Sequence, residues 1–331
     1  MDKIKIKKSE GGYMRVRFGY VAIAMRLDKV TSSSPVTYKK YASIDSEKER
    51  LSLLKRVTQS NLRDLIKILN YNIEYDIHFY RLTSKLIPLA THQEVLWNYS
   101  KVIKTECEQV AQLIQSHQMR VDAHPDQFNV LNSTNPAVVE SSIMTLEHQL
   151  DLFDLFQMKH GKLVLHVGGK AGGKDNALER FVKTFHQLSP RLQQALILEN
   201  DDKTYSAKDV LGLCQQLNIP MVLDIHHHRC YHEGESLDDM VEDIFKTWKD
   251  DYWPPKIHVS SPKEFENDRR HSDFIEVEDM LKFLELVKPL NQDIDVMIEA
   301  KQKDLALHRL VHDLKQARPH WKWIDHTTVE F

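Results

Sequence analysis

Residues 221–228, MVLDIHHH, end an apolar run of strand length with an aspartate and three histidines. Asp224 and His227 have the spacing D-x-x-H, and side chains from a strand tip and the turn after it can converge on one cation. A carboxylate with an imidazole suits Zn²⁺, Mn²⁺ or Fe²⁺ and fits Ca²⁺ poorly, because imidazole nitrogen is a borderline-soft ligand. Taken alone, the stretch is equally well explained as a solvated, histidine-rich loop. Other apolar runs end in the same way, and that repetition favours a shared site.

Strand-like and helix-like segments alternate along the whole chain. Regular alternation indicates a parallel sheet, and about eight units predict an α/β fold with a single (β/α)₈ TIM barrel rather than an open doubly wound sheet. No G-x-G-x-x-G follows the first run, which weakens the dinucleotide-binding alternative. The predicted strands are residues 15–25, 74–81, 119–123, 162–165, 194–198, 220–223, 255–259 and 295–298, and the predicted helices are residues 47–70, 94–117, 136–159, 175–187, 206–217, 237–248, 276–287 and 305–315.

The composition is typical of a globular protein with a sizeable core, at 41% hydrophobic and 28% charged residues. No Pro/Ser/Gly-rich linker or low-complexity run interrupts the chain. The sequence therefore predicts one barrel domain over residues 13–331, after a flexible polar leader at residues 1–12. The Lys/Ile alternation of the leader has an alternative interpretation as a basic arm that reaches a phosphate backbone.

Charge and cysteine content limit the partners and the compartment. The 45 basic and 48 acidic residues give a net charge of −3, so binding to nucleic acid would need a local basic face or bound cations. The three cysteines lie far apart without a C-x-x-C pair, which is typical of a reducing cytoplasm. No apolar run reaches transmembrane length, and the N-terminus lacks the apolar core of a signal peptide. We expect a cytoplasmic monomer that makes no membrane contact.

In a TIM barrel the chemistry lies at the C-terminal ends of the strands, where the loops converge. A lone histidine there is more often a core residue, and a lone glutamate is usually just solvated. Six metal-capable groups at equivalent points of one barrel favour a functional site instead. The predicted strand ends, in chain order, are Tyr20, Arg81, His124, His166, Glu199, Asp224, His258 and Glu299.

The six metal-capable strand ends exceed what one ion needs, because a catalytic zinc takes three protein ligands and a water. The surplus predicts two or three metals that share a bridging carboxylate, and Glu199, from the middle of the set, is the candidate bridge. His227, together with His271 in the loop DRRHSDF, would supply a further ion. Multinuclear sites of this kind serve phosphoester hydrolysis: one ion lowers the pKa of its bound water, and the others clamp the phosphate and the leaving oxygen.

Lys256 lies two residues before His258, so both side chains would point into the barrel. A buried charged lysine is costly. Lys256 is therefore paired with a carboxylate, chemically modified, or low enough in the barrel to reach water. The alternative is that Lys256 merely starts the strand after Pro254 and Pro255.

Two loops carry further signals. The loop HVGGKAGGKD, residues 166–175, can cradle a phosphate with its backbone N–H groups, but it lacks the spacing G-x-x-x-x-G-K-[ST], so we expect no nucleotide cofactor. In HPDQF, residues 124–128, Gln127 and Phe128 follow a predicted ligand. An exposed aromatic beside an amide can wedge into a base stack and bond to the bases left behind. Packing of Phe128 against a neighbouring loop is the alternative.

Together these segments resemble the UV damage endonuclease family over nearly the whole chain, from FGY at residues 18–20 to IEAKQKD at residues 298–304. The combination is highly specific, and LENDDKT, PLATH and IEAKQKD are distinctive even singly. The segments that carry the resemblance are YRLTSKLIPLATH (80–92), HPDQF (124–128), HVGG (166–169), LENDDKT (198–204), LDIHH (223–227), KIHVSSPK (256–263), RRHSD (269–273) and MIEAK (297–301).

The resemblance implies a TIM barrel related to the endonuclease IV group, with two or three divalent metals, most often Mn²⁺, with Zn²⁺ or Co²⁺ as alternatives. It implies an enzyme that nicks UV-damaged double-stranded DNA immediately 5′ to cyclobutane pyrimidine dimers and 6–4 photoproducts, and at abasic sites, leaving a 3′-hydroxyl and a 5′-phosphate. By position, the implied metal ligands are His124, His166, Glu199, Asp224, His227, His258, His271 and Glu299.

The resemblance also implies roles for side chains around the metals. His92 matches a further active-site histidine, and Lys256 falls where family members can bear a carboxylated lysine, so we assign both to catalysis with Glu199. The pair Gln127 and Phe128 matches residues that probe the strand opposite the lesion. The loop after the first strand reads VAIAM, where relatives place an asparagine, and so departs from the family pattern. The residues assigned to DNA or lesion contact are Tyr20, Arg81, Gln127 and Phe128.

Two other functions are compatible with the same residues. A sugar isomerase or epimerase on this barrel also uses His, Glu and Asp around divalent ions. A non-catalytic, metal-dependent DNA-binding module would bind irradiated duplex without cutting it. Nicking of irradiated but not of unirradiated plasmid distinguishes the endonuclease from both.

Overall fold

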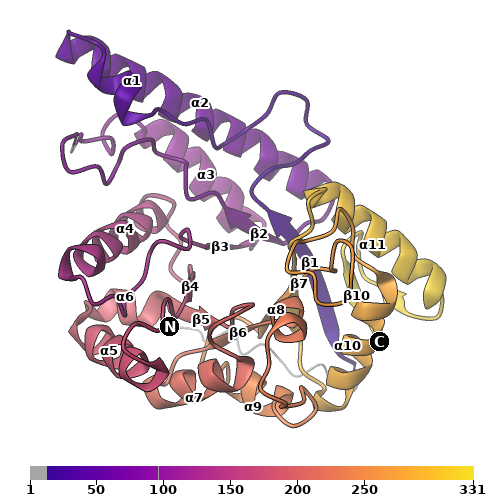
Figure 1. Ribbon diagram of the computed structural model, residues 1–331. Coiled ribbons are helices and arrows are strands. Elements are labelled where there is room, and N and C mark those ends of the chain that lie inside the picture. The colour runs from indigo at the N-terminus through magenta and orange to yellow at the C-terminus, as the bar shows by residue number, and fades with distance from the viewer. Residues whose placement is uncertain (1–12, 96) are drawn as a thin grey trace.

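Eight parallel strands form a closed barrel in the computed structural model, which describes residues 13–95 and 97–331 (Figure 1). The ring closes because β1 pairs with β8 along one edge and with β2 along the other. This confirms the predicted TIM barrel, whereas the predicted leader lies outside the described residues. The barrel strands are β1 (Arg15–Val21), β2 (Phe79–Leu82), β3 (Arg120–Ala123), β4 (Leu163–His166), β5 (Leu196–Glu199), β6 (Met221–Asp224), β7 (Lys256–Val259) and β8 (Ile294–Ile298).

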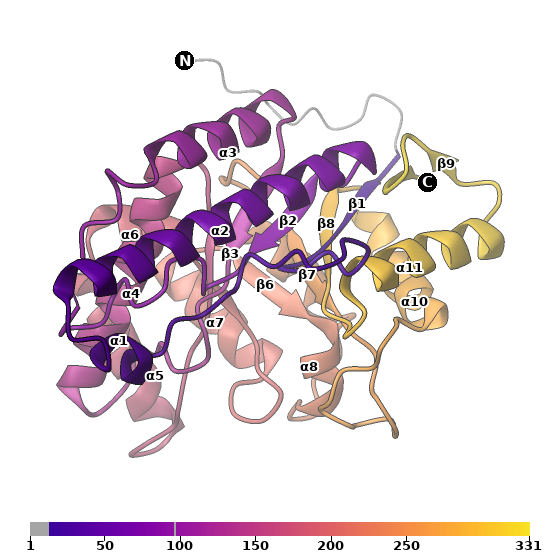
Figure 2. The ribbon, with the colours of Figure 1, turned by 90° about the horizontal axis from the view of Figure 1, so that it is seen from above.

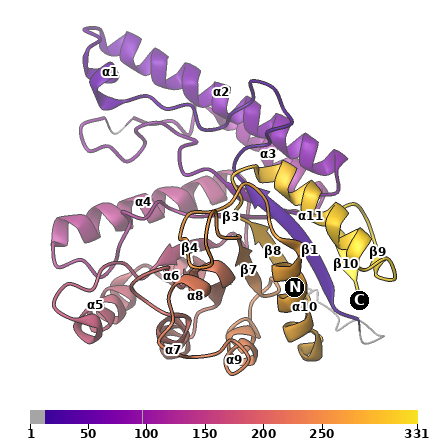
Figure 3. The same ribbon diagram turned by 45° about the vertical axis from the view of Figure 1, so that its right-hand side comes forward.

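Helices surround the strands, and α11 lies along the outside of β1 (Figure 3). Among the described residues, no helix combines the length and the apolar character that crossing a membrane requires. The α-helices are α1 (Tyr38–Ala42), α2 (Glu47–Glu74), α3 (Lys104–Ser116), α4 (Pro136–Leu155), α5 (Lys174–Gln187), α6 (Pro190–Ala195), α7 (Ala207–Leu217), α8 (Ile225–Cys230), α9 (Val241–Lys246), α10 (Val277–Val287) and α11 (Lys303–Ala317), and a 3₁₀ turn, η1, spans Lys288–Leu290.

Two predicted boundaries are wrong on the β2 side of the barrel. The helix predicted at residues 94–117 begins only at Lys104. Before it, the indole of Trp97 is buried and donates to the Pro88 carbonyl (3.3 Å). The strand predicted from residue 74 begins at Phe79, since α2 continues to Glu74. By contrast, the predicted cap of α7 is confirmed as a capping box between Ser206 and Asp209.

A short C-terminal hairpin, which the sequence did not indicate, completes the edge where β1 and β2 diverge. Its strands are β9 (Lys322–Trp323) and β10 (Thr328–Glu330), and β10 runs antiparallel to the first half of β1. Thr327 joins both sides of the gap: its hydroxyl donates to the Asp76 carbonyl (2.6 Å), and its own carbonyl accepts from the Phe18 amide (3.1 Å). The hairpin therefore covers backbone groups at the N-terminal end of the barrel that no neighbouring barrel strand satisfies.

Side chains along each strand alternate between the surrounding helices and the barrel lumen. On β4, Leu165 packs in the large core between strands and helices, whereas Val164 belongs to a small separate cluster. The cluster consists of Val164, Ile197, Val222 and Trp248. Its three strand residues each stand two positions before His166, Glu199 or Asp224, so the same alternation points these three polar side chains into the C-terminal end of the lumen.

Charged side chains fill the N-terminal end of the lumen. Arg120 is fully buried and donates to Asp122 (3.1 Å) and to Asp295 (2.9 Å). Arg17 makes two parallel bonds to Asp295 (2.6 and 2.8 Å), and the Lys256 ammonium pairs with Asp122 (3.2 Å). Burial lowers the pKa of Lys256 to about 8, against the attraction of Asp122. Of the three states expected for Lys256, the structure shows the pairing with a buried carboxylate, that of Asp122.

We expect the substitution Asp295→Asn to lower the free energy of unfolding by about 3 kcal/mol, because it leaves two arginines facing each other in a buried site without their shared anion. Urea denaturation followed by circular dichroism measures this. The matched control is Asp313→Asn, which removes the exposed pair with Arg309 and should cost less than about 1 kcal/mol. Equal losses in the two variants would contradict a structural role for the buried network.

Candidate metal centre

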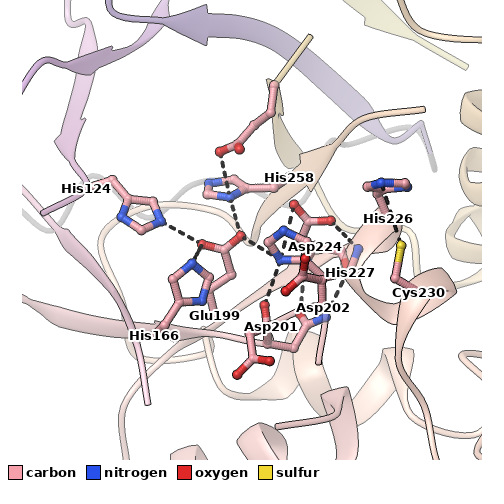
Figure 4. Close-up of polar contacts among 12 residues, drawn as sticks. His124, His166, Glu199, Asp201, Asp202, Asp224, His226, His227, Cys230 and His258 are labelled. Atoms are coloured by element: carbon pink, nitrogen blue, oxygen red, sulfur yellow. Dashed lines mark hydrogen bonds and ion pairs between the residues drawn. The ribbon is translucent and has the colours of Figure 1, made fainter. Parts of the chain in front are cut away.

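The carboxylate of Glu199, at the end of β5, is the centre of a cluster of imidazoles (Figure 4). Only 1% of the residue is exposed. Its Oε2 lies 2.9 Å from His124 Nε2 and 3.7 Å from His166 Nε2. Its Oε1 lies 2.8 Å from His258 Nδ1 and 3.6 Å from His227 Nδ1. Each carboxylate oxygen therefore faces a separate pair of imidazole nitrogens.

Among the described residues, three groups of side chains have ligand atoms within 4.8 Å of one another, and Glu199 belongs to all three. A carboxylate shared in this way is suited to bridging neighbouring cations, because its two oxygens can bind different ions. Seven of the eight predicted ligands take part, and His271 lies just outside. The groups are His124, His166 and Glu199; Glu199, Asp224 and His227; and Glu199, His258 and Glu299.

The two carboxylate oxygens of Asp224 have different surroundings. Its Oδ1 accepts from the His227 amide (2.8 Å) and so caps α8, a helix that replaces the turn expected after β6. The cap fixes the first turn of α8, in which the His227 ring faces Glu199, whereas His226 lies against Cys230 (Figure 4). The second oxygen, Oδ2, is buried and has no hydrogen-bond partner among the described residues, and His227 Nδ1 faces it at the longer distance of 3.7 Å.

An oxygen that no hydrogen bond satisfies indicates that the cluster suits a cation. A buried carboxylate oxygen without a donor is costly, and a positive ion beside it would remove the cost. Burial raises the pKa of Asp224, against the attraction of His227 and with the repulsion of Glu199. Oxygen and imidazole donors together match Mn²⁺, Zn²⁺ or Co²⁺ better than Ca²⁺. The residues present therefore fit divalent transition metals.

Charges within the cluster perturb several pKa values. Burial alone would raise the pKa of Glu199, but the imidazoles, above all His258 and His166, hold it well below its usual range. Burial alone would lower the pKa of His227, but Asp224 and Glu199 raise it to about 9. Without a metal, the site thus combines an ionised carboxylate with a protonated imidazole at neutral pH.

Asn200 is a site residue that sequence reasoning missed. Its buried side chain bonds both backbone groups of Asp224, accepting from N–H (2.9 Å) and donating to C=O (3.0 Å). The backbone carbonyl oxygen of Asn200 lies 2.9 Å from His227 Nδ1. Asn200 therefore fixes the end of β6 to the end of β5. Its place directly after Glu199 in the segment ENDDKT was the available signal.

Glu299 and His271 occupy the β8 side of the cluster. Arg81, at the end of β2, forms an ion pair with Glu299. Burial would raise the pKa of Glu299, and Arg81 together with His258 lowers it below its usual range. His271 Nδ1 bonds the Glu299 carbonyl (2.7 Å), and its ring centroid lies 6.2 Å from that of His227. The structure thus places His271 beside the cluster, and its role as a ligand remains a prediction.

The remaining predicted residues differ in exposure. Phe128 is 77% exposed and Gln127 is exposed beside it, in the loop after His124. His92 lies outside the three groups: its ring stacks on Tyr38 with centroids 4.2 Å apart. Tyr20 is fully buried, and its hydroxyl donates to Asn72 (2.7 Å). The structure therefore presents the first two side chains at the surface but not Tyr20.

Comparisons with known proteins agree with this geometry. The model of the family described as UV-endonuclease UvdE matches residues 16–331. A UV DNA damage endonuclease from Halalkalibacterium halodurans is 40% identical over 307 residues, which cover 92% of this chain and 95% of the relative. The crystal structure of SacUVDE is similar with a TM-score of 0.81 and 32% identity, covering 92% of this chain and 99% of that one. Endonuclease IV from Thermus thermophilus, at 12% identity over 91% of this chain and 99% of its own, has a TM-score of 0.57 and shows the shared fold alone.

We expect a divalent ion to release a proton when it binds, because His227, with a pKa of about 9, is protonated at neutral pH and an imidazole ligand must be neutral. Below that pKa, apparent affinity for Mn²⁺ should fall about tenfold for each unit of pH. Calorimetric titration in two buffers of different ionisation enthalpy counts the protons.

The variant His227→Asn should release one proton fewer than the wild type. The matched control is His160→Asn, whose ring stacks on Tyr252 away from the cluster and should leave the count unchanged. An unchanged count in His227→Asn would show that this imidazole does not bind the ion.

Proposed function

Because the chain belongs to the UV-endonuclease UvdE family, we propose that it is a metal-dependent DNA repair endonuclease acting on UV-damaged double-stranded DNA. It nicks the phosphodiester immediately 5′ to cyclobutane pyrimidine dimers and 6–4 photoproducts, and at abasic sites. The products carry a 3′-hydroxyl and a 5′-phosphate. The single observation that best supports this chemistry is the buried Glu199 carboxylate, which three candidate metal groups share.

Two or three divalent ions, most often Mn²⁺ in this family, would be held by the three groups and by His271. When bound, such ions supply a water of lowered pKa and positive charge for the phosphate oxygens. The protein keeps Glu199 ionised by surrounding it with imidazoles, and it holds each imidazole on a different strand end or helix. These contacts fix the ligand atoms before DNA arrives, so little reorganisation is needed at the moment of reaction.

Arg81 and Lys256 act beside the ligands. Arg81 pairs with Glu299 through one Nη, which leaves other guanidinium donors for a DNA phosphate. Lys256 stands two residues before His258 on β7, directly beneath the cluster, and its pKa of about 8 leaves a share of neutral amine near neutral pH. Neutral amine is the form that carboxylation requires. His92 would join the site by leaving its stack on Tyr38.

Selectivity for damage follows from the depth of the site. Glu199 and Asp224 are buried, so the damaged dinucleotide must leave the duplex to bring its phosphate near them. Poor pairing and stacking at a photoproduct lower that cost, whereas intact DNA bears it in full. Gln127 and Phe128 are exposed in the loop after His124, where they can occupy the space left opposite the flipped bases.

Family membership favours cleavage over the sugar isomerase or epimerase alternative. It also favours cleavage over the DNA-binding module that does not cut. A net charge of −3 is compatible with DNA binding, because bound cations and local basic residues such as Arg81 supply positive charge where the phosphate arrives.

We expect Glu199→Gln to lose nearly all nicking activity, because a neutral amide can neither balance the imidazoles nor bridge cations. The assay follows conversion of irradiated supercoiled plasmid to open circles in the presence of Mn²⁺, with unirradiated plasmid alongside. The matched control is Glu330→Gln in the C-terminal hairpin, which should retain activity. Circular dichroism verifies that both variants are folded. Nicking by Glu199→Gln at the wild-type rate would contradict the bridging role.

We expect Phe128→Ala to lower kcat/KM about tenfold on a duplex with one thymine dimer, because the exposed ring no longer stacks in the gap opposite the lesion. The control is a duplex with two abasic positions opposite the dimer, in which only the dimer strand is labelled, so that nicks at the abasic positions are not counted. There the ring has no bases to displace or stack on, and the wild type and Phe128→Ala should cleave at similar rates. A tenfold difference on both substrates would assign Phe128 to another part of the DNA.

A further inference from the structure

The segment between β7 and α10 forms an arm that leaves the metal centre and returns to it. We call residues 261–272 the β7–α10 arm, and it lies beside α8 (Figure 2). Pro262 and His271 form an antiparallel bridge, and the Lys263 amide donates to the Arg270 carbonyl (3.0 Å). The two sides of the arm are therefore tied together over two successive residue pairs.

The tip of the arm is held by a cluster of ion pairs. The Arg270 guanidinium contacts Asp268 (2.7 Å) and Glu264 (2.8 Å), and Asp268 also accepts from the Glu264 amide (3.2 Å). The Asp268 amide donates to the Phe265 carbonyl (2.8 Å). Phe265 stands at this turn with 62% of its surface exposed. The tip thus presents an aromatic ring to solvent on a turn that backbone and side-chain hydrogen bonds close.

The base of the arm is fixed to the metal centre at two points. His271 Nδ1 bonds the Glu299 carbonyl (2.7 Å). Arg269 makes two bonds to Asp202 (2.5 and 2.9 Å), in the loop that follows Glu199. The position of Phe265 is therefore coupled to the same backbone that carries the carboxylates of the site.

Phe128 and Phe265 extend from opposite sides of the centre. Phe128 follows His124, which contacts Oε2 of Glu199. The arm of Phe265 begins beside His271, next to His227 on the Oε1 side. His124 and His227 flank Glu199 in Figure 4. The loops that carry the two rings follow β3 and β7, which stand four places apart in the ring of eight barrel strands, so the loops leave the mouth on opposite sides.

We propose that Phe265 is a second aromatic contact to DNA, which packs against bases or sugars of the duplex on the opposite side of the metal centre from Phe128. The inference rests on the proposed function, since a DNA duplex would contact both phenyl rings only if its scissile phosphate lies at the metal centre between them. A ring on a fixed turn loses little conformational entropy when it stacks, and every base offers a face to stack on.

The charges of the arm specify the kind of contact. Between residues 263 and 270 there are three basic residues (Lys263, Arg269, Arg270) and three acidic ones (Glu264, Glu266, Asp268), so this stretch has no net charge. The two ion-paired carboxylates of the tip, Glu264 and Asp268, both face Arg270. The contribution of Phe265 therefore comes from the aromatic face and not from attraction to phosphate, and it is insensitive to salt.

The test compares steady-state cleavage of a duplex with one thymine dimer by the wild type, Phe265→Ala and Phe265→Trp, all with Mn²⁺. Phe265→Ala should raise KM about tenfold with little change in kcat, because the ring contacts DNA away from the reacting phosphate. Phe265→Trp should restore KM. The slope of log(kcat/KM) against log[salt] should be the same in all three.

The matched control is Tyr252→Ala. Tyr252 is also an exposed aromatic, at 39%, but it stacks on His160 and lies in the loop that enters β7 at the opposite end of the barrel. This variant should keep the wild-type KM. Thermal unfolding of Phe265→Ala should match the wild type, because the lost ring is at the surface.

The outcomes separate this inference from the proposed function. If the wild type leaves irradiated DNA uncut, the proposed function fails, and the inference fails with it. If the wild type cuts and Phe265→Ala has the wild-type KM, the inference alone is overturned. A raised KM that Phe265→Trp does not restore, or a changed salt slope, also overturns it. A raised KM restored by tryptophan with an unchanged slope supports it.

Discussion

The whole mouth of the barrel depends on keeping one buried carboxylate charged. Glu199 is almost completely removed from water, and an isolated carboxylate there would take up a proton. Imidazoles prevent this by approaching both oxygens, and they come from β3, β4, β7 and α8. Each imidazole comes from a different strand or helix of the ring, so the cluster forms only when the barrel is closed in this register. The cluster in turn stabilises that register only while its charges are balanced.

In the layer beneath the mouth, buried carboxylates are again kept charged, here by arginine and lysine instead of imidazoles. Asp122 and Lys256 stand two residues before His124 and His258, where most other strands carry apolar residues. Their ion pair continues through Arg120 to Asp295, and the aromatic faces of Trp248 and Trp253 lie 5.2 and 5.6 Å from the Arg120 guanidinium. This buried network lies directly beneath two of the imidazoles and holds a lysine of lowered pKa in the layer below the candidate metal centre.

Much of the architecture could be predicted from the sequence, because alternation of strands and helices is a local signal and strand ends have a fixed meaning in a closed barrel. The pattern predicted which strand-end side chains would lie near one another, while their roles as ligands stay predictions. Pairings across the ring were not predictable. That Arg81 would meet Glu299 depends on a tertiary contact between segments far apart in the chain. The Asp224 cap on α8 and the Trp97–Pro88 bond before α3 are contacts within ten residues, which the period of apolar residues does not encode.

The proposed recognition residues and the candidate metal ligands lie on different parts of the same loops, and this separation has a physical reason. The candidate ligands must be buried and rigid, so they cannot adapt to the shape of a lesion. Phe128 and Phe265 stand a few residues further out, exposed, on loops whose bases are fixed at the cluster. Under the proposed function, a substitution of either ring would change the contacts with the duplex without disturbing the charges around Glu199. Such a division lets discrimination arise from the cost of deforming DNA, which is lower at a photoproduct than in an intact stack.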